Sequence, residues 1–82
     1  MKRSQVAWDT SSQQGRPRLT ATLIDKDGLE WKVTINVEPI RLHGKIVSAI
    51  LVCKTAGMLH SANTHSTISA AQEWCYEKVG IE

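Results

Sequence analysis

Residues 18–38, "RLTATLIDKDGLEWKVTINVE", decide the fold of this chain. From Leu29 to Val37 apolar and polar residues alternate, and this period of two is typical of a β-strand with one buried face. Residues 18–25 form the first strand and residues 29–38 the second, and the "DKDG" between the two is rich in turn residues. Gly28 can adopt the positive φ that a tight turn needs. The stretch therefore predicts an antiparallel hairpin.

The turn of this hairpin sets the register of both strands. A two-residue turn at Lys26 and Asp27 pairs Ile24 with Leu29 and places threonines beside apolar residues of the second strand. A three-residue turn with Gly28 as a left-handed bulge places every apolar side chain on one face instead. Since a slip by one residue turns a whole strand over, we predict the bulged hairpin. Its pairs are Leu23 with Trp31, Ala21 with Val33, and Leu19 with Ile35.

Two more strands are expected after this hairpin. Pro39 lacks an N–H to donate, so the second strand should end near Glu38. "KIVSAILVC" (45–53) then forms a strand that is apolar on both faces, and "MLHSAN" (58–63) pairs back against it. If Met58 opposes Cys53, His60 points to the face of Leu51, whereas a slip by one residue sends it to the other face. The sequence leaves this direction open.

The C-terminal residues predict one helix. It should begin near Thr67 or Ser69, since Ser69 has capping-box spacing to Gln72 and Thr67 is an alternative cap. Gly80 is a natural C-terminal stop. The apolar stripe of the helix consists of Ile68, Ala71, Cys75 and Val79, with Trp74 at its border. The expected fold is α+β: an antiparallel three- to four-stranded meander with one C-terminal helix packed on one face.

The 82 residues suffice for one small domain, and its basic charge lies near the N-terminus. Residues 1–18 hold four basic side chains and one acidic one, whereas residues 19–82 hold six basic and seven acidic ones. The polar residues 1–17 are therefore expected to form a flexible basic arm, ahead of a single ββββα domain over residues 18–82.

The sequence favours a location in the cytoplasm. No apolar run approaches the ~20 residues of a membrane span, and the N-terminus lacks the apolar segment of a secretory signal. Two cysteines without such a signal fit free thiols in a reducing compartment.

Four side chains invite a metal or catalytic interpretation: Cys53, His60, His65 and Cys75. His60 and His65 have a spacing found in zinc sites, but the cysteines are too far apart to form a zinc knuckle. Both cysteines fall at apolar positions, where a free thiol behaves as a small hydrophobic group. No catalytic motif surrounds them, and a chain of this size has little room for a substrate cleft. We therefore predict no metal, no cofactor and no catalytic residue.

The strand at 45–53 suggests binding. One of its faces packs under the helix, while the other still presents aliphatic side chains that a single helix cannot cover. That second face needs Val6 and Trp8 folded back over it, a second copy of the chain, or a partner protein. We expect partner contacts on this face, on the arm and around Trp8. The candidate residues are Trp8, Arg16, Arg18, Lys32, Thr34 and Asn36.

Nucleic acid is the alternative partner. The arginines of the arm can reach phosphates or a groove, and Lys32, Thr34 and Asn36 on the polar strand face can touch bases. Glu30 and Glu38 on the same face would repel phosphate.

Strands followed by "THSTISAAQEWCYEKVG" (64–80) resemble the architecture of small accessory proteins of phages and other mobile elements. In that group, which includes anti-CRISPR and other anti-defence proteins, a meander precedes a Thr- or Ser-capped helix with Ala-Ala and Trp on its inner face. The resemblance covers roughly residues 18–80 and implies a non-enzymatic inhibitor that blocks a host complex by surface contact. Many such inhibitors are acidic mimics of DNA, whereas this chain carries a net charge of +2. We therefore expect recognition through surface shape and surface patches.

Overall fold

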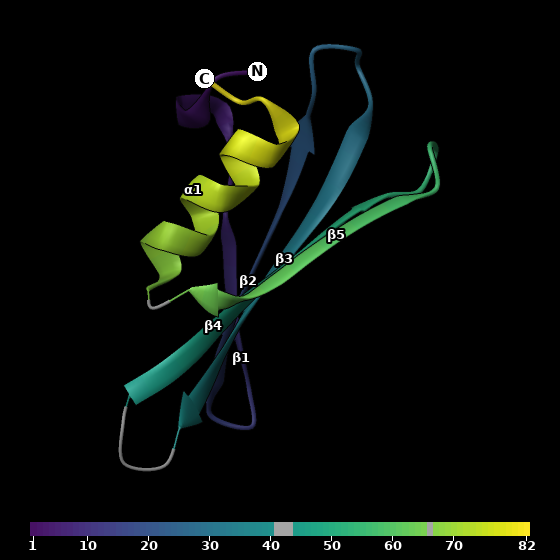
Figure 1. Cartoon of the computed structure of the whole chain (residues 1–82). Helices are drawn as coiled ribbons and strands as arrows, with labels where there is room; N and C mark the ends of the chain where they lie inside the picture. The colour runs from purple at the N-terminus through teal and green to yellow at the C-terminus, as the bar shows by residue number, and fades with distance from the viewer. Residues whose placement is uncertain (41–43, 66) are drawn as a thin grey trace.

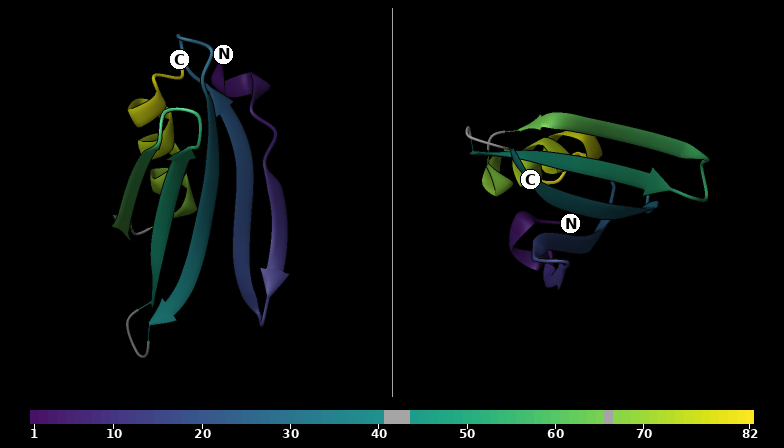
Figure 2. Two further views of the ribbon diagram at one scale, coloured as in Figure 1. Left: turned by 90° about the vertical axis from the view of Figure 1, so that its right-hand side faces the viewer. Right: turned by 90° about the horizontal axis from the view of Figure 1, so that it is seen from below.

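A computed structural model of the chain describes residues 1–40, 44–65 and 67–82, without the side chains of residues 40 and 63–65. It contains one antiparallel sheet whose strands lie side by side in sequence order, with the helix on one face (Figures 1 and 2). The expected α+β meander is confirmed, but the sheet has five strands instead of three or four. The elements are β1 (Asp9–Gln13), β2 (Arg16–Ile24), β3 (Glu30–Ile40), β4 (Gly44–Cys53), β5 (Met58–His65) and α1 (Ile68–Val79), after a short 3-10 turn at Arg3–Gln5.

The hairpin of β2 and β3 has the predicted register. Leu23 opposes Trp31, Ala21 opposes Val33, and Leu19 opposes Ile35. Gly28 has φ +81°, as the bulged turn requires. The carboxylate of Asp25 accepts hydrogen bonds from the backbone N–H groups of Asp27 and Leu29, each at 2.9 Å, and so closes the turn.

β3 runs two residues further than expected, to Ile40, and Pro39 lies within it opposite Lys45. At that position β3 is paired with β4, whereas its pairing with β2 has ended near Asn36. The proline nitrogen can therefore face the unpaired side without breaking the ladder.

The fifth strand, β1, comes from the segment expected to be an arm. Residues 9–13 pair with residues 16–20 of β2, so the folded domain begins well before residue 18. Gln14 and Gly15 both have positive φ (+55° and +76°), which is the geometry of a tight type I′ hairpin turn. The fold therefore includes this polar edge strand, although every β1 side chain is exposed.

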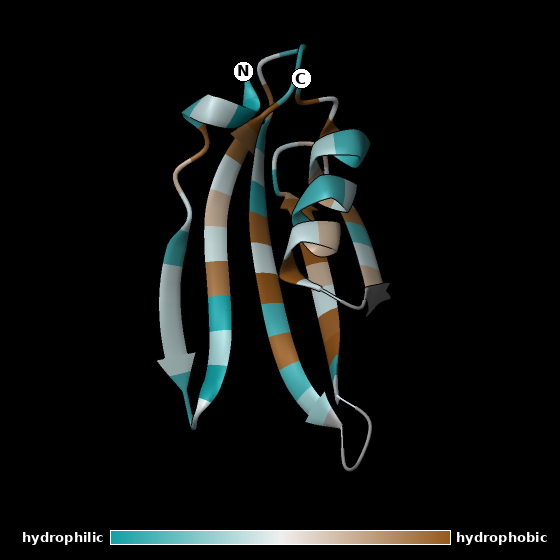
Figure 3. Ribbon diagram, turned by 90° about the vertical axis from the view of Figure 1, so that its left-hand side faces the viewer, coloured by the Kyte–Doolittle hydropathy of each residue, from teal (hydrophilic) through white to brown (hydrophobic). Residues whose placement is uncertain are grey.

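The core lies between the sheet and α1 (Figure 3). The helix contacts β3, β4 and β5, and the half-buried Val6 and Trp8 of the N-terminal segment pack against the same core. Alternation along the strands supplies the buried apolar side chains, which appear as alternating bands in Figure 3. The largest that are fully buried are Leu23, Ile35, Leu51, Val33, Val47, Cys53 and Cys75.

The last strand and the helix resolve two open questions. Met58 opposes Cys53, so His60 lies opposite Leu51 on the helix side of the sheet. The side chain of His65 lies outside the described residues. Thr67, the alternative cap, is the N-cap of α1, because its hydroxyl accepts the backbone N–H of Ala70 at 3.0 Å. Gly80 closes the helix in the left-handed conformation, as predicted.

Candidate functional site

The sheet face opposite α1 has no second layer among the described residues, and we call it the open face (Figure 2). Because side chains alternate along a strand, its described side chains are those of the odd-numbered residues of β1, the even-numbered residues of β2, β3 up to Glu38 and β4, and Leu59 and Ser61 of β5. Val6 and Trp8 pack on the other side, against the core and the helix, so these two side chains do not cover this face. Met1, Gln5 and Ala7 approach one end of it, where they line a hollow together with Thr20, Thr22 and Lys32.

One half of the open face, over β1, β2 and β3, is largely polar, with the exposed Ile24 as an apolar exception at one end. Five of the six residues predicted to contact a partner lie together in this half: Arg16, Arg18, Lys32, Thr34 and Asn36. In the sheet, Arg18 lies directly opposite Asn36, and Asn36 lies opposite Ser48 of β4. The strand register therefore gathers these residues into one patch.

The charges of this polar half balance. Its cations are Arg16, Arg18 and Lys32, and its anions are Asp9, Glu30 and Glu38. Arg16 forms an ion pair with Glu38 at 3.0 Å, although both side chains are more than half exposed, at 55% and 61%. An ion pair this exposed contributes little to stability, so both groups remain available to a partner.

The other half of the open face, over β4 and β5, is largely aliphatic. Ile46, Ile50 and Val52 line β4, and Leu59 of β5 lies directly opposite Val52. Leu59 is 64% exposed and Ile46 is 39% exposed, whereas Ile50 and Val52 are half-buried. Ile50, Val52 and Leu59 therefore form an apolar strip that water still reaches, and Ser48 separates it from Ile46 on the same face. Sequence reasoning recognised the aliphatic row on β4 but missed the contribution of Leu59.

A hollow of about 480 Å³ lies in the polar half, near the turn between β1 and β2. Residues of four adjacent strands line it, among them Gln13, Arg18, Asn36 and Ser48. The guanidinium of Arg18 donates from Nη1 to the side-chain oxygen of Gln13 at 3.4 Å, which is a long hydrogen bond. Its Nε atom is buried and has no hydrogen-bond partner among the described residues.

Trp8, the sixth predicted contact residue, lies apart from the other five. Its indole N–H donates to the hydroxyl of Tyr76 on α1 at 2.8 Å, and the two rings meet edge to face. The guanidinium of Arg3 lies 5.0 Å from the centre of the same Tyr76 ring and forms an ion pair with Glu73. Residues 1–8, expected within a flexible arm, are therefore docked on the helix by specific contacts.

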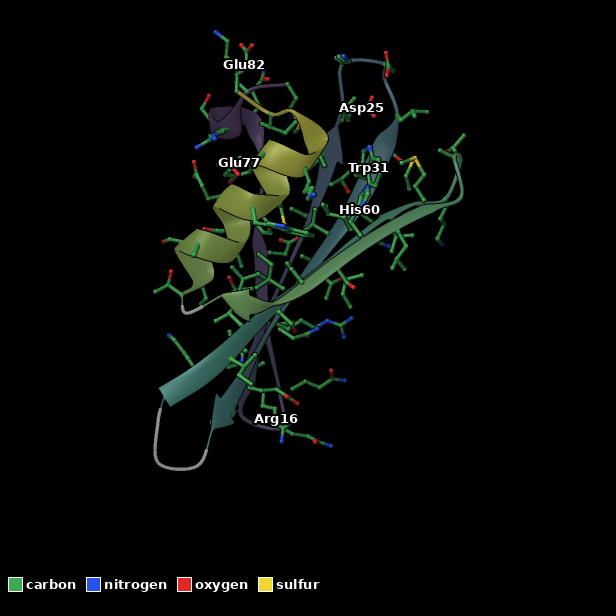
Figure 4. All side chains as sticks on the ribbon, viewed as in Figure 1. Arg16, Asp25, Trp31, His60, Glu77 and Glu82 are labelled. Carbon is green, nitrogen blue, oxygen red and sulfur yellow. The ribbon has the colours of Figure 1, made fainter. Side chains whose placement is uncertain are left out.

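A second cluster of polar and aromatic groups lies on the helix side, where Asp25, Trp31 and His60 meet (Figure 4). The indole N–H of Trp31 donates to the carboxylate of Asp25 at 2.9 Å. This hydrogen bond, the largest cause, holds the pKa of Asp25 below its ordinary value, with help from the backbone N–H groups of the turn. The cluster fastens the turn to the sheet, and its hydrogen bonds are used within the fold.

Both cysteines are buried free thiols in the core. Burial raises the pKa of Cys75 to about 12, which keeps its thiol protonated and unreactive. Within the part of the chain that the structure describes, no three His, Cys, Asp or Glu side chains gather closely enough to hold a metal ion.

A scan of protein-family models and searches of curated proteins and of solved structures found no match to this chain. Over residues 1–40, 44–65 and 67–82, no helix is long and apolar enough to cross a membrane.

Proposed function

We propose that this protein is a small non-enzymatic binding protein that inhibits or modulates a host protein complex by surface contact, as phage-encoded anti-defence proteins do. The observation that carries the proposal is the aliphatic strip of the open face, with Leu59 at 64% exposure beside the polar half. Large exposed apolar patches bordered by polar residues mark protein interaction sites. A protein interface likewise combines an apolar centre with a polar rim.

The partner is a folded protein with an apolar patch of its own. The strip of β4 and β5 supplies the apolar area, and the neighbouring residues of β2 and β3 supply hydrogen bonds that fix orientation. Nucleic acid fits this face less well, because binding to it depends on a surplus of positive charge. The three cations of the polar half are matched by three anions, among them Glu38.

Comparative affinity capture tests this proposal. The wild-type chain and the variant Leu59→Asp are used as bait in lysate of the host, and the captured protein is purified and recombined with each bait. We expect one complex to bind the wild type stoichiometrically and to be lost with the variant, because a charge in the apolar strip must be desolvated on binding. Equal recovery on both baits contradicts the use of the open face.

Two further measurements exclude other occupants of the open face. Light scattering of the pure protein should give the mass of a monomer, and a stable dimer that Leu59→Asp dissociates would assign the face to a second copy. Titration of labelled duplex and single-stranded DNA should give only weak binding. Sub-micromolar binding with steep salt dependence would assign the protein to the nucleic-acid-binding class instead.

A further inference from the structure

The hollow on the polar half of the open face has the composition of a site for an anion. Its volume is about 480 Å³, and two arginines, Arg16 and Arg18, line it together with amide and hydroxyl groups of Gln13, Asn36 and Ser48. Glu38 is the acidic residue on its wall, so the lining carries one more positive than negative charge.

The two arginines of the hollow differ in their partners. Arg16 already has a carboxylate partner, because its Nη1 lies 3.0 Å from Glu38. Arg18 has no acidic partner among the described residues; its one side-chain acceptor there is the neutral amide oxygen of Gln13, at 3.4 Å. The excess positive charge of the hollow therefore belongs to Arg18.

The Arg18 guanidinium is also under-used as a hydrogen-bond donor. A guanidinium has five N–H donors arranged in a fork that matches the two oxygens of a carboxylate. Nε of Arg18 is buried without a partner in the described part of the chain, and leaving a buried donor unpaired is unfavourable. An acceptor that displaced the weakly held Gln13 side chain could pair with Nε and a terminal nitrogen together.

We propose that Arg18 is the receptor for a single carboxylate, supplied by an aspartate or glutamate side chain of the partner protein, which enters this hollow when the partner docks. The inference rests on the proposed function, since it names the chemistry of the partner at one point of the open face. Asn36 and Ser48, which follow Arg18 across the sheet in register, line the hollow and can donate further hydrogen bonds to the incoming group.

A carboxylate suits the hollow better than the phosphate of a nucleic acid does. One excess positive charge matches one carboxylate, whereas successive phosphates would also approach Glu38 and the other acidic residues of the face, Asp9 and Glu30. The bidentate geometry of the guanidinium serves either anion, so the surrounding charge decides between them.

The test is a nuclear magnetic resonance titration of the isolated, nitrogen-15-labelled protein. The probe is the α-amide of N-acetylglutamate, and the matched control is the α-amide of N-acetylglutamine, which has nearly the same shape without the charge. We expect the glutamate probe to shift the Arg18 Nε–H resonance saturably, with a dissociation constant on the order of millimolar. The glutamine probe should leave this resonance in place, and Arg16 should respond less than Arg18.

Variants locate the site and other outcomes overturn it. In the wild type, the glutamate probe should also shift the amide resonances of Gln13 and Asn36, which line the hollow. Arg18→Gln should abolish these shifts, whereas Lys32→Gln, which removes one positive charge from the same face, should leave them unchanged. The proposal is overturned if both probes act equally, if Arg18 does not respond, or if inorganic phosphate binds more tightly than the glutamate probe. Since the wild-type titration needs neither a variant nor a partner, its failure removes the carboxylate site while leaving the capture experiment to judge the docking surface.

Discussion

The imidazole ring of His60 stacks on the indole ring of Trp31, with ring centres 5.6 Å apart and planes inclined by 20°. The two residues belong to β5 and β3, which are separated by β4, so the stack passes over β4 on the helix side of the sheet. On its other side Trp31 is tied to the hairpin turn through Asp25. The stack therefore links the edge strand of the aliphatic strip to the hairpin that organises the fold.

We expect His60→Ala to lower the free energy of unfolding by about 1 kcal/mol, because an aromatic pair contributes roughly that much beyond its buried area. Urea denaturation followed by tryptophan fluorescence measures the change. Ser61→Ala, at the next residue on the open face, is the matched control and should behave as the wild type. An unchanged midpoint for His60→Ala would contradict a stabilising role for the stack.

Asp25 should make stability depend on acidic pH. Its pKa is lowered in the folded protein from an ordinary value of 3.8, so the carboxylate stabilises the fold fully above that pH. The stabilisation is lost as pH falls through the lower folded value. We expect Asp25→Asn to be less stable than the wild type at neutral pH and to lack this part of the acid dependence. Asp27→Asn, in the same turn, leaves the indole bond intact and should retain it; identical acid profiles for wild type and Asp25→Asn would refute the assignment.

Cys75 should make stability depend on alkaline pH. Burial raises its pKa from 9.0 to about 12, so above pH 9 the thiol ionises in the unfolded chain but not in the folded one. The free energy of unfolding should therefore fall as pH rises above 9. At pH 8, iodoacetamide should modify Cys75 in urea but not in the native protein, as judged by mass spectrometry. Rapid labelling of the native protein would show that the helix does not seal this part of the core.

The contact between Trp8 and Tyr76 should be worth about 1 kcal/mol, as is usual for a hydrogen bond between neutral groups. Tyr76→Phe removes the acceptor and Trp8→Phe removes the donor, so a double-mutant cycle isolates the pair. We expect the two losses of stability to be non-additive by roughly that amount. Additive losses would mean that the N-terminal segment is held on the helix by other contacts.

The part of the fold that the sequence predicts is the part where one pattern excludes its alternatives. In the hairpin of β2 and β3, only the bulged turn at Gly28 places all apolar residues on one face, and the structure has that register. The apolar stripe of the helix follows in the same way, with Ala71, Cys75 and Val79 buried. The direction of His60 depends on a single register that no apolar pattern in β5 specifies, and it remained open.

β1 escaped prediction for a physical reason. Its residues are all polar and exposed, so they carry no alternation, and backbone pairing adds the strand to the sheet edge together with a few long side-chain hydrogen bonds. Its turn has Gln14 at a position where Asn or Asp is the usual signal for positive φ. The docking of Trp8 on Tyr76 depends on a contact between residues 68 apart in the chain, which local patterns cannot reveal. The gathering of Arg18, Lys32, Thr34 and Asn36, by contrast, follows directly from strand alternation, and Arg16 joins them because β2 begins two residues earlier than expected.

The most direct test of the open face as the docking surface compares two adjacent residues of β5 in the reconstituted complex. Leu59 lies on the open face at 64% exposure, whereas Met58 lies on the opposite face at 45% exposure, so the same new charge can be placed on either side of one strand. Isothermal titration calorimetry with the purified partner should show that Leu59→Asp weakens binding at least about tenfold, equivalent to ~1.4 kcal/mol, while Met58→Asp binds as the wild type. Equal affinities for the two variants, or a larger loss for Met58→Asp, would show that the partner does not dock on the open face.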